Sequence, residues 1–475
     1  MKNLPHDLLL HIFELSLPLM KTRAAVQTCI LIKGWNHLWP YFSGLDFDLS
    51  EFNTRDPEQD EQKFFHFVTR MLECHRAAKV NKFRLSCVNF CKKKYALTIE
   101  KWIMYALQHQ VKVLELTVCS GIRKLITQCI AASNSLEELH LHLNECGRHD
   151  RILYMPNVSI NSPTLQKLHL HIPGMMCGDL FTNLISGCPL LKDLWLESVT
   201  VLSSAIIRSE NLEHLTFKNC KLTGRYETET KKINLPRLHK LSFLGGNILC
   251  HCILELISGC PLLEDLWVES LDMQFEFIIS LEKLQNLTFK NCKCWKISIE
   301  APSLVSFYFV GPVATGIFDL KLGSLSSLTT ANSSLRHSCS ESYILNYNLE
   351  GLSYAKHLEL CAYKVAANLQ SPPYHLTLYN LQSLSFCGHC FKYIFAMCKD
   401  MPNLEKITLW PNCQHSLWFP KSIKWDDALF GLLIRCKKLK EVEVVAARFI
   451  DQEKQLDGLC KIKMSKINCH IQEIL

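Results

Sequence analysis

One pattern of apolar and polar positions recurs along most of the chain: apolar, two variable residues, apolar, one variable residue, apolar. The alternation at its end, as in Leu168 and Leu170 or Leu194 and Leu196, is typical of a short β-strand with one buried face. The first positions of the pattern are Val80, Val111, Leu136, Leu165, Leu191, Leu212, Leu238, Leu263, Leu284, Leu304, Ala355, Leu381, Leu404 and Leu439. The chain is therefore predicted to form a long series of short strands.

A block of several such units is duplicated. Residues 184–198 return 72 positions later as residues 256–270 with two differences, and residues 212–220 return at the same offset as 284–292. Three units of about 24 residues fit this offset, within the range of leucine-rich repeats. The stretches 179–186 and 253–258 are predicted to be short helices, and each is followed by Gly-Cys-Pro. Because no single unit buries its own apolar face, only stacking stabilises the series.

The predicted fold class is α/β, with a small N-terminal helical module followed by a leucine-rich-repeat solenoid. A parallel sheet is expected on the concave side and helices outside. At the ninth position of three units, Asn144, Cys220 and Cys292 are expected to bond backbone groups of the turn. We assign 1–48 to the helical module, 49–79 to a connector that is polar and mobile over 50–63, 80–450 to the solenoid and 451–475 to a C-terminal cap. Around 311–354 we expect degenerate units or a loop.

The N-terminal module carries more apolar residues than three short helices need for a core, which predicts an apolar face left for a partner. Helical spacing places several of them on one face: Leu8, Leu9, Ile12, Phe13 and Leu15. Pro5 suits the first turn of this helix, and Pro18 ends it. The alternative is an ordinary N-terminal cap on the following domain.

Leu4-Pro5-His6-Asp7-Leu8-Leu9 at the start, Val26 to Leu31, and Trp35 to Pro40 together resemble an F-box. The resemblance departs at Ile32 and Gly34, where plant F-boxes usually have Ser and Arg. Taken together, the F-box-like segment and the repeats make most of the chain similar to plant F-box/LRR and F-box/FBD/LRR proteins. The resemblance implies docking to a Skp-family adaptor, and through it to a cullin ubiquitin ligase. The implied adaptor-binding residues are Leu4, Pro5, Leu8, Leu9, Ile12, Val26, Leu31, Trp35, Leu38 and Trp39.

Composition narrows the partners. The chain has 52 basic against 45 acidic residues, with no long basic run, which argues against nucleic acid as the main partner. No apolar stretch reaches the length of a membrane span, and the start does not read as a signal peptide. The 24 cysteines are then expected to be reduced thiols in the cytoplasm or nucleus.

A search for reactive chemistry finds little, so we expect no enzyme activity, no cofactor and no metal. Cys387-Gly388-His389-Cys390 matches a disulfide-isomerase motif, but it directly follows a repeat strand and lacks a thioredoxin-like context. The pairs His140 and His142, and His169 and His171, alternate on strands and would face one way. They can hold a metal in principle, and solvated strand histidines are the plainer interpretation.

In a leucine-rich solenoid the variable positions between core residues face the partner. Trp195 and Trp267 each lie there between two acidic residues, with a lysine-bearing strand following, a composition typical of a binding hot spot. The alternative is that each Trp packs against neighbouring strands, or that duplication copied an inert feature. The candidate substrate-binding residues are Asp193, Trp195, Glu197, His214, Lys218, Asp265, Trp267, Glu269 and Lys290.

The favoured function is that of an adaptor: the F-box holds the ligase core, and the solenoid binds a substrate protein. A second hypothesis is a small-molecule-dependent F-box receptor, which similar hormone receptors suggest but the sparse arginine content disfavours. A third is an interaction scaffold whose F-box has degenerated.

Overall fold

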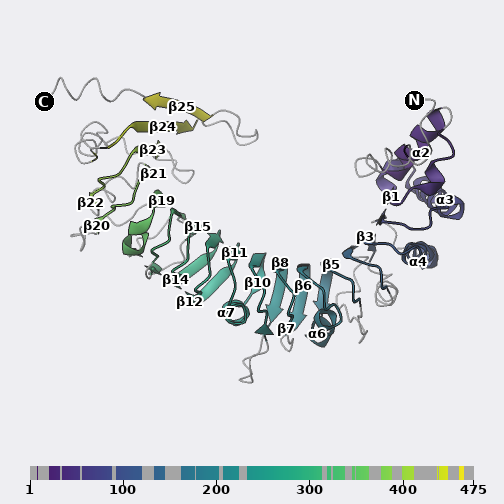
Figure 1. The fold of residues 1–475 in the computed structure, drawn as a ribbon, viewed down its shortest axis with the longest axis horizontal. Coiled ribbons are helices and arrows are strands. Elements are labelled where there is room, and N and C mark those ends of the chain that lie inside the picture. Colours follow the sequence, from purple (N-terminus) through teal and green to yellow (C-terminus); the bar gives the residue numbers. More distant parts are fainter. Residues whose placement is uncertain are drawn as a thin grey trace. The chain divides into compact units, whose positions relative to one another are not determined.

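The computed structural model divides the chain into two compact units, residues 1–238 and 239–475, which are described separately. The described residues are 8, 21–32, 35–53, 56–87, 93–119, 133–144, 162–176, 178–202, 207–223, 233–312, 318–322, 325–336, 345–347, 349–362, 376–387, 398–410, 436, 438–447 and 459–464. Each unit contains a row of parallel strands that neighbour one another in chain order (Figure 1).

The first unit builds one parallel sheet with the strand order β1-β2-β3-β4-β5-β6-β8. Helix α6 packs against β6 and β7, and β7 pairs with β9. The described elements are α2 (Thr22–Leu31), a 3-10 turn (Trp39–Tyr41), β1 (Gly44–Asp48), a 3-10 turn (Leu49–Phe52), α3 (Pro57–Cys74), β2 (Lys82–Ser86), α4 (Lys93–Gln108), β3 (Val113–Cys119), β4 (Glu138–Asn144), β5 (Lys167–Met176), α6 (Gly178–Ser186), β6 (Asp193–Leu202), β7 (Ile207–Arg208), β8 (His214–Thr223) and β9 (Ile233–Asn234).

The second unit continues the same plan, with the parallel order β10-β11-β13-β15-β17-β19-β21-β23-β24 and β25 antiparallel at the end. Four further strands, β12, β14, β16 and β18, form a second parallel ladder. The elements are β10 (Lys240–Ile248), α7 (Cys250–Ser258), β11 (Asp265–Glu269), β12 (Asp272–Ser280), β13 (Asn286–Lys290), β14 (Lys293–Glu300), β15 (Ser306–Pro312), β16 (Phe318–Leu322), β17 (Thr330–Arg336), β18 (Leu345–Tyr347), a 3-10 turn (Leu349–Tyr354), β19 (His357–Ala362), β20 (Leu376–Thr377), β21 (Ser383–Cys387), β22 (Cys398–Asp400), β23 (Lys406–Trp410), β24 (Glu441–Ala447) and β25 (Leu459–Met464).

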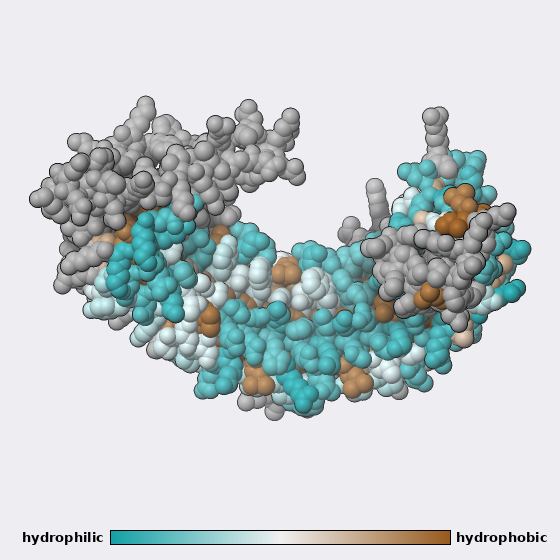
Figure 2. All heavy atoms as spheres, turned by 45° about the horizontal axis from the view of Figure 1, so that its top comes forward, coloured by the Kyte–Doolittle hydropathy of each residue, from teal (hydrophilic) through white to brown (hydrophobic). Residues whose placement is uncertain are grey.

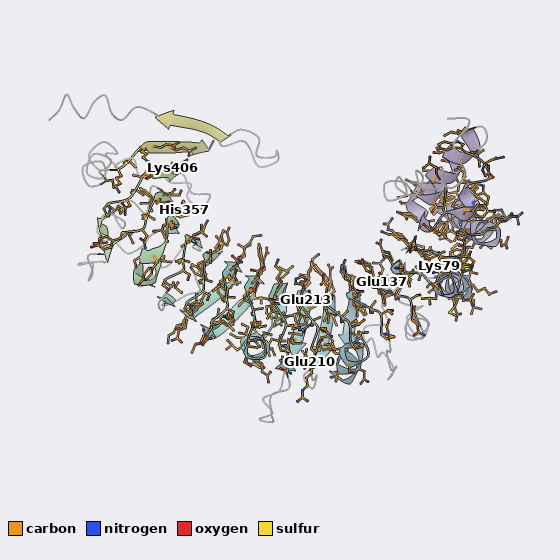
Figure 3. All side chains as sticks on the ribbon, in the orientation of Figure 1. Lys79, Glu137, Glu210, Glu213, His357 and Lys406 are labelled. Carbon is orange, nitrogen blue, oxygen red and sulfur yellow. The ribbon has the colours of Figure 1, made fainter. Side chains whose placement is uncertain are left out.

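The predicted repeat core is confirmed. Every first position from Val80 to Leu404 is at most 1% exposed, whereas Leu439 is half-buried. The alternating residues after it are buried too, such as Leu194 and Leu196, so the polar residues between them share the opposite face of each strand (Figure 3). The two predicted helices are α6 and α7, and the α/β repeat fold follows the sequence pattern.

Duplication preserved the backbone as well as the sequence. Ser198 and Ser270 have φ of 59° and 56°, and Asn219 and Asn291 have φ of 51° and 54°. Directly after these asparagines, the thiols of Cys220 and Cys292 donate to the carbonyls of Leu196 and Val268, each at 3.3 Å. The prediction of backbone bonds at the ninth position is therefore confirmed for both cysteines. For Asn144 the described residues show a different bond, in which its Oδ1 accepts from His142 Nε2 at 3.0 Å.

The sheet begins earlier than expected, and the connector is largely a packed helix. Strand β1, inside the segment assigned to the N-terminal module, pairs in parallel with β2. Within 49–79, α3 buries Phe64, Val68, Met71 and Leu72 and is capped by Asp56, whose side chain accepts from the backbone of Glu58 and Gln59. This helix was not predicted because its first two turns are polar and its apolar face begins only at Phe64.

The segment 311–354, in which the sequence pattern is weak, contains a repeat unit. Leu325 and Leu328 are buried, and the Leu328 N–H donates to the Leu325 carbonyl, the same turn bond that precedes other strands. Strand β17 then pairs in register with β15 and β19. Of the alternatives of a degenerate unit or a loop, the described residues support the unit. The described part of the C-terminal segment, β25, pairs antiparallel with β24.

Candidate functional site

The N-terminal helix α2 is fixed to the first strand of the sheet. Thr22 Oγ1 accepts from the Asp46 backbone N–H at 2.6 Å, and Lys21 Nζ lies 2.7 Å from Asp48 Oδ2. The Arg23 guanidinium lies over the Phe52 ring, 4.2 Å from its centroid, and donates to the Glu51 carbonyl. These contacts connect the start of α2 to β1 and to the 3-10 turn that follows it.

An apolar run lies exposed at the end of α2. Ala25 and Cys29 are fully buried on one face of the helix, whereas Ile30 is 63% exposed and Leu31 83%. Figure 2 shows apolar surface near this end of the chain, beside hydrophilic surface. Two consecutive branched aliphatic side chains at that exposure leave apolar area in water, which is typical of a surface that binds a partner.

The predicted adaptor-binding residues fall into four groups. Leu8 and Leu31 are exposed, and Trp35 and Trp39 are half-buried. Val26 and Leu38 are buried, and Leu38 has no exposed surface, so in this conformation they pack inside the module. The remaining four lie outside the described residues: Leu4, Pro5, Leu9 and Ile12. The binding role of the set stays a prediction.

A compact cluster occupies the polar face of β4, β5, β6 and β8. The His142 and His171 rings stack in parallel with centroids 3.8 Å apart, and the His169 ring lies 5.3 Å from Trp195. Glu197 lies within 3.6 Å of His169 Nε2 and 3.7 Å of His171 Nδ1. The histidines thus face one way, as the alternation predicted.

Charge in this cluster is concentrated on one ion pair. Burial, and then the neighbouring imidazoles, lower the pKa of His169 and of His171, so both rings favour the neutral form. Burial alone would raise the pKa of Glu197, but the hydrogen bond and charge of Lys218, 3.0 Å away, outweigh it and hold this pKa below its usual range. Trp195 Nε1 is buried without a hydrogen-bond partner among the described residues.

The second copy of this motif is more open. Trp267 is 40% exposed, and its Nε1 donates to Glu269 Oε2 at 3.0 Å. Lys290 Nζ lies 2.8 Å from Glu269 Oε1, matching the ion pair of the first copy. The two tryptophans differ because their neighbours on the preceding strand differ: His169 lies beside Trp195, but the smaller Ser242 lies beside Trp267. Trp195 is therefore packed against its neighbours, whereas Trp267 is exposed.

This difference predicts unequal stability effects. Trp195→Ala should lower the free energy of unfolding by about 1–2 kcal/mol, because it removes a half-buried ring and its contact with His169. Trp267→Ala should change it by less than about 0.5 kcal/mol, as for other surface substitutions. Denaturant unfolding of the two single variants measures both values. Equal losses would contradict the distinction.

The polar side chains Asp193, His214 and Asp265 complete the predicted substrate-binding set. Asp193 Oδ2 lies 3.9 Å from His214 Nδ1, and Asp265 Oδ2 lies 3.2 Å from Lys240 Nζ. All nine predicted residues lie on the polar faces of β6, β8, β11 and β13, as expected. Their role in binding a substrate is not tested by this placement and stays a prediction.

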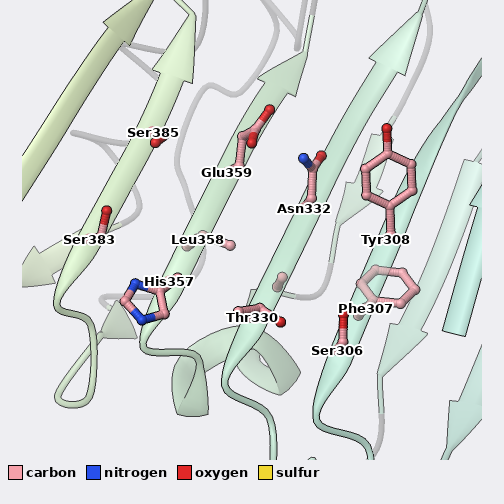
Figure 4. Close-up of a pocket in the computed structure, with 11 residues that line it drawn as sticks. Ser306, Phe307, Tyr308, Thr330, Asn332, His357, Leu358, Glu359, Ser383 and Ser385 are labelled. Atoms are coloured by element: carbon pink, nitrogen blue, oxygen red, sulfur yellow. The ribbon is translucent and has the colours of Figure 1, made fainter. Parts of the chain in front are cut away.

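A pocket of about 260 Å³ opens on the polar face between β15 and β21 (Figure 4). Its lining includes Tyr308, Asn332 and Glu359, which lie in register on neighbouring strands, with the short side chains of Ser383 and Ser385 beyond them. None of these lining residues belongs to the predicted substrate-binding set. The alternation of Thr330 and Asn332 after Leu328 is the sequence pattern that could have identified part of this pocket.

Histidine, cysteine and acidic side chains are the groups of the described residues that reactive chemistry would use. Among them, no group of three or more histidine, cysteine or acidic side chains is arranged to hold a metal ion, and no helix is long and apolar enough to cross a membrane. Burial raises the pKa of Cys220 and Cys292 to about 11, so these thiols stay protonated at neutral pH. Cys119 is disulfide-bonded, which corrects the expectation of reduced thiols at that position. Cys387 ends β21, and 388–390 lie outside the described residues.

Comparison with known proteins supports the resemblance seen in the sequence. An Arabidopsis thaliana protein named for an F-box and leucine-rich repeats is 31% identical over 257 residues, which cover 52% of this chain and 50% of that protein. An F-box/FBD/LRR-repeat protein of the same plant is 28% identical over 252 residues, 50% of this chain and 52% of the relative. A third, another F-box/FBD/LRR-repeat protein, is 29% identical over 260 residues, 53% of this chain and 55% of the relative. No family model matches the chain.

The chain spans about half the length of the curated relatives it matches. The predicted similarity to plant F-box/LRR and F-box/FBD/LRR proteins is confirmed. The described strands and helices agree with a leucine-rich-repeat fold.

Proposed function

We propose that this chain is the substrate-recognition subunit of a Skp–cullin–F-box ubiquitin ligase. In this proposal the N-terminal module docks a Skp-family adaptor, and the polar face of the repeats binds a substrate protein. The chain itself performs no chemistry, because its partners transfer ubiquitin. We place this activity in the cytoplasm or nucleus, where such ligases act.

The observation that carries the proposal is the exposed apolar run at the end of α2. Ile30 and Leu31 are largely exposed directly beside buried Cys29, while α2 itself is held on β1 by Thr22. A module that is bonded to the sheet and presents aliphatic side chains to solvent favours docking of a protein partner. The F-box in the names of the relatives supports a Skp-family adaptor as this partner.

The polar face supports the second half of the proposal. Its rows combine ion pairs, such as Lys218 with Glu197 and Lys290 with Glu269, with the exposed ring of Trp267. Mixed charge around an aromatic residue is typical of protein-binding surfaces, because the aromatic supplies affinity and the charges supply specificity.

Substituting the predicted start of the docking helix tests this function. A full-length Leu4→Ala, Pro5→Ala double variant should lose co-purification with a Skp-family adaptor, because both residues are implied contacts of the F-box. Its melting temperature and its capture of other proteins should stay as in the wild type, since the repeats are untouched. Affinity capture followed by mass spectrometry measures the co-purification, and a thermal melt measures the stability. Adaptor capture that survives the double substitution would remove the F-box assignment.

A further inference from the structure

Among the described residues, every acidic side chain on the polar face of the main strands except Glu359 lies close to a basic side chain. The described acidic side chains on this face of the main strands have a Lys, Arg or His nitrogen within 4.0 Å: Asp46, Asp48, Glu115, Glu138, Asp193, Glu197, Asp265, Glu269, Glu441 and Glu443. Glu359, in the middle of β19, has no such partner among the described residues, and its side chain interacts only with Asn332. Among the described residues, the series of ion pairs is therefore interrupted at the pocket.

The residues that lie in register with Glu359 on the neighbouring strands are uncharged, and His357 lies two positions before it on β19. Asn332 lies beside it on β17 and Ser385 on β21, with Tyr308 one strand further along. A carboxylate accepts only, so the Asn332 amide must turn its NH₂ group toward Glu359. Figure 4 shows this arrangement, with the amide oxygen on the side of Tyr308. That oxygen is buried and has no hydrogen-bond donor among the described residues.

The pocket forms because several of the side chains that line it are short. Thr330, Ser383 and Ser385 are short, whereas the larger Tyr308 lies on β15 at one side and His357 lies on β19, the strand of Glu359. Burial raises the pKa of Glu359, and the hydrogen bond from Asn332 offsets this only in part. A half-buried carboxylate with a single amide donor is stabilised by a cation that brings further N–H donors.

We propose that this pocket receives an arginine side chain of the substrate protein. The inference rests on the proposed function, since it names a feature of the protein that the repeats bind. A guanidinium presents five N–H donors in a planar fork and no acceptor. It pairs with both oxygens of Glu359, donates to Asn332 Oδ1 and stacks on the Tyr308 ring. A lysine ammonium lacks the planar fork that fits a carboxylate and a ring together.

The test compares arginine with its neutral isostere. The full-length protein is applied to an array of dodecapeptides of varied sequence, printed as pairs that differ only by arginine or citrulline at one position. We expect bound peptides to contain arginine, and citrulline to lower their signal roughly tenfold or more. Glu359→Gln should abolish this preference, because Gln keeps the shape and the Asn332 bond but loses the charge. Glu405→Gln changes a half-buried acidic residue that is paired with Lys440 before β23; it makes the same charge change and should preserve the preference.

Two further measurements separate the possible failures. Free acetyl-arginine methylamide that binds as tightly as the peptides would overturn the assignment to a protein side chain and indicate a small cationic ligand. Peptides that tolerate citrulline, an absence of arginine-dependent binding, or a preference that survives Glu359→Gln would overturn the inference. Adaptor capture is measured on the same preparations. Normal adaptor capture without arginine preference refutes this inference alone, and arginine preference without adaptor capture supports it while refuting the ligase assignment.

Discussion

Replacing Phe289 with alanine should lower the free energy of unfolding by about 3–5 kcal/mol, a larger loss than that expected for either tryptophan variant. Phe289 on β13 is fully buried between two other rings, with centroids 5.8 Å from Phe277 and 6.1 Å from Phe309. The rings come from different strands, so the substitution leaves a cavity that links neighbouring repeats. Because repeats depend on their neighbours for burial, the loss should reduce the cooperativity of the second unit.

Denaturant unfolding followed by circular dichroism measures this loss. The matched control is Ile278→Ala on β12, since Ile278 is 52% exposed and its removal should cost less than about 0.5 kcal/mol. A Phe289→Ala variant as stable as this control would show that the aromatic stack does not hold the repeats together.

Most of the fold could be predicted because the repeat signal is local. A strand of Leu-x-Leu type carries its own buried face, and 72-residue duplication repeats it in register. The unit around β17 could not be distinguished from a loop, because Ala331 and Ser333 replace the usual large apolar pair. There the strand depends on pairing with β15 and β19, which no local pattern reveals. Helix α3 was missed for a different reason, since its polar first turns resemble a linker.

The candidate sites show where local sequence stops being informative. Trp195 and Trp267 have nearly identical flanking residues, yet His169 covers one and Ser242 leaves the other open. The difference is set by residues one strand away. Glu359 is similar: among the described residues it has no cationic partner, because Asn332 and Ser385 lie beside it on the adjacent strands. Sequence identified which positions face outward, but the strand register decides what each one touches.

Leu31→Asp should weaken binding to a Skp-family adaptor by at least roughly thirtyfold. Truncating an apolar anchor at an interface can lose about 2 kcal/mol or more, and an aspartate adds the cost of burying an unpaired charge. Leu31 is 83% exposed in the free chain, so the same substitution should leave the fold intact. Leu97→Asp on α4 is the matched control, because Leu97 is also an exposed helical leucine, at 69%, outside the predicted docking surface.

Calorimetric titration of a purified Skp-family adaptor into the full-length wild type, Leu31→Asp and Leu97→Asp tests the ligase assignment most directly. The account predicts saturable one-to-one binding to the wild type and Leu97→Asp with equal dissociation constants, and binding to Leu31→Asp that is weaker by roughly thirtyfold or more. No binding to the wild type, or equal binding to all three chains, would contradict it.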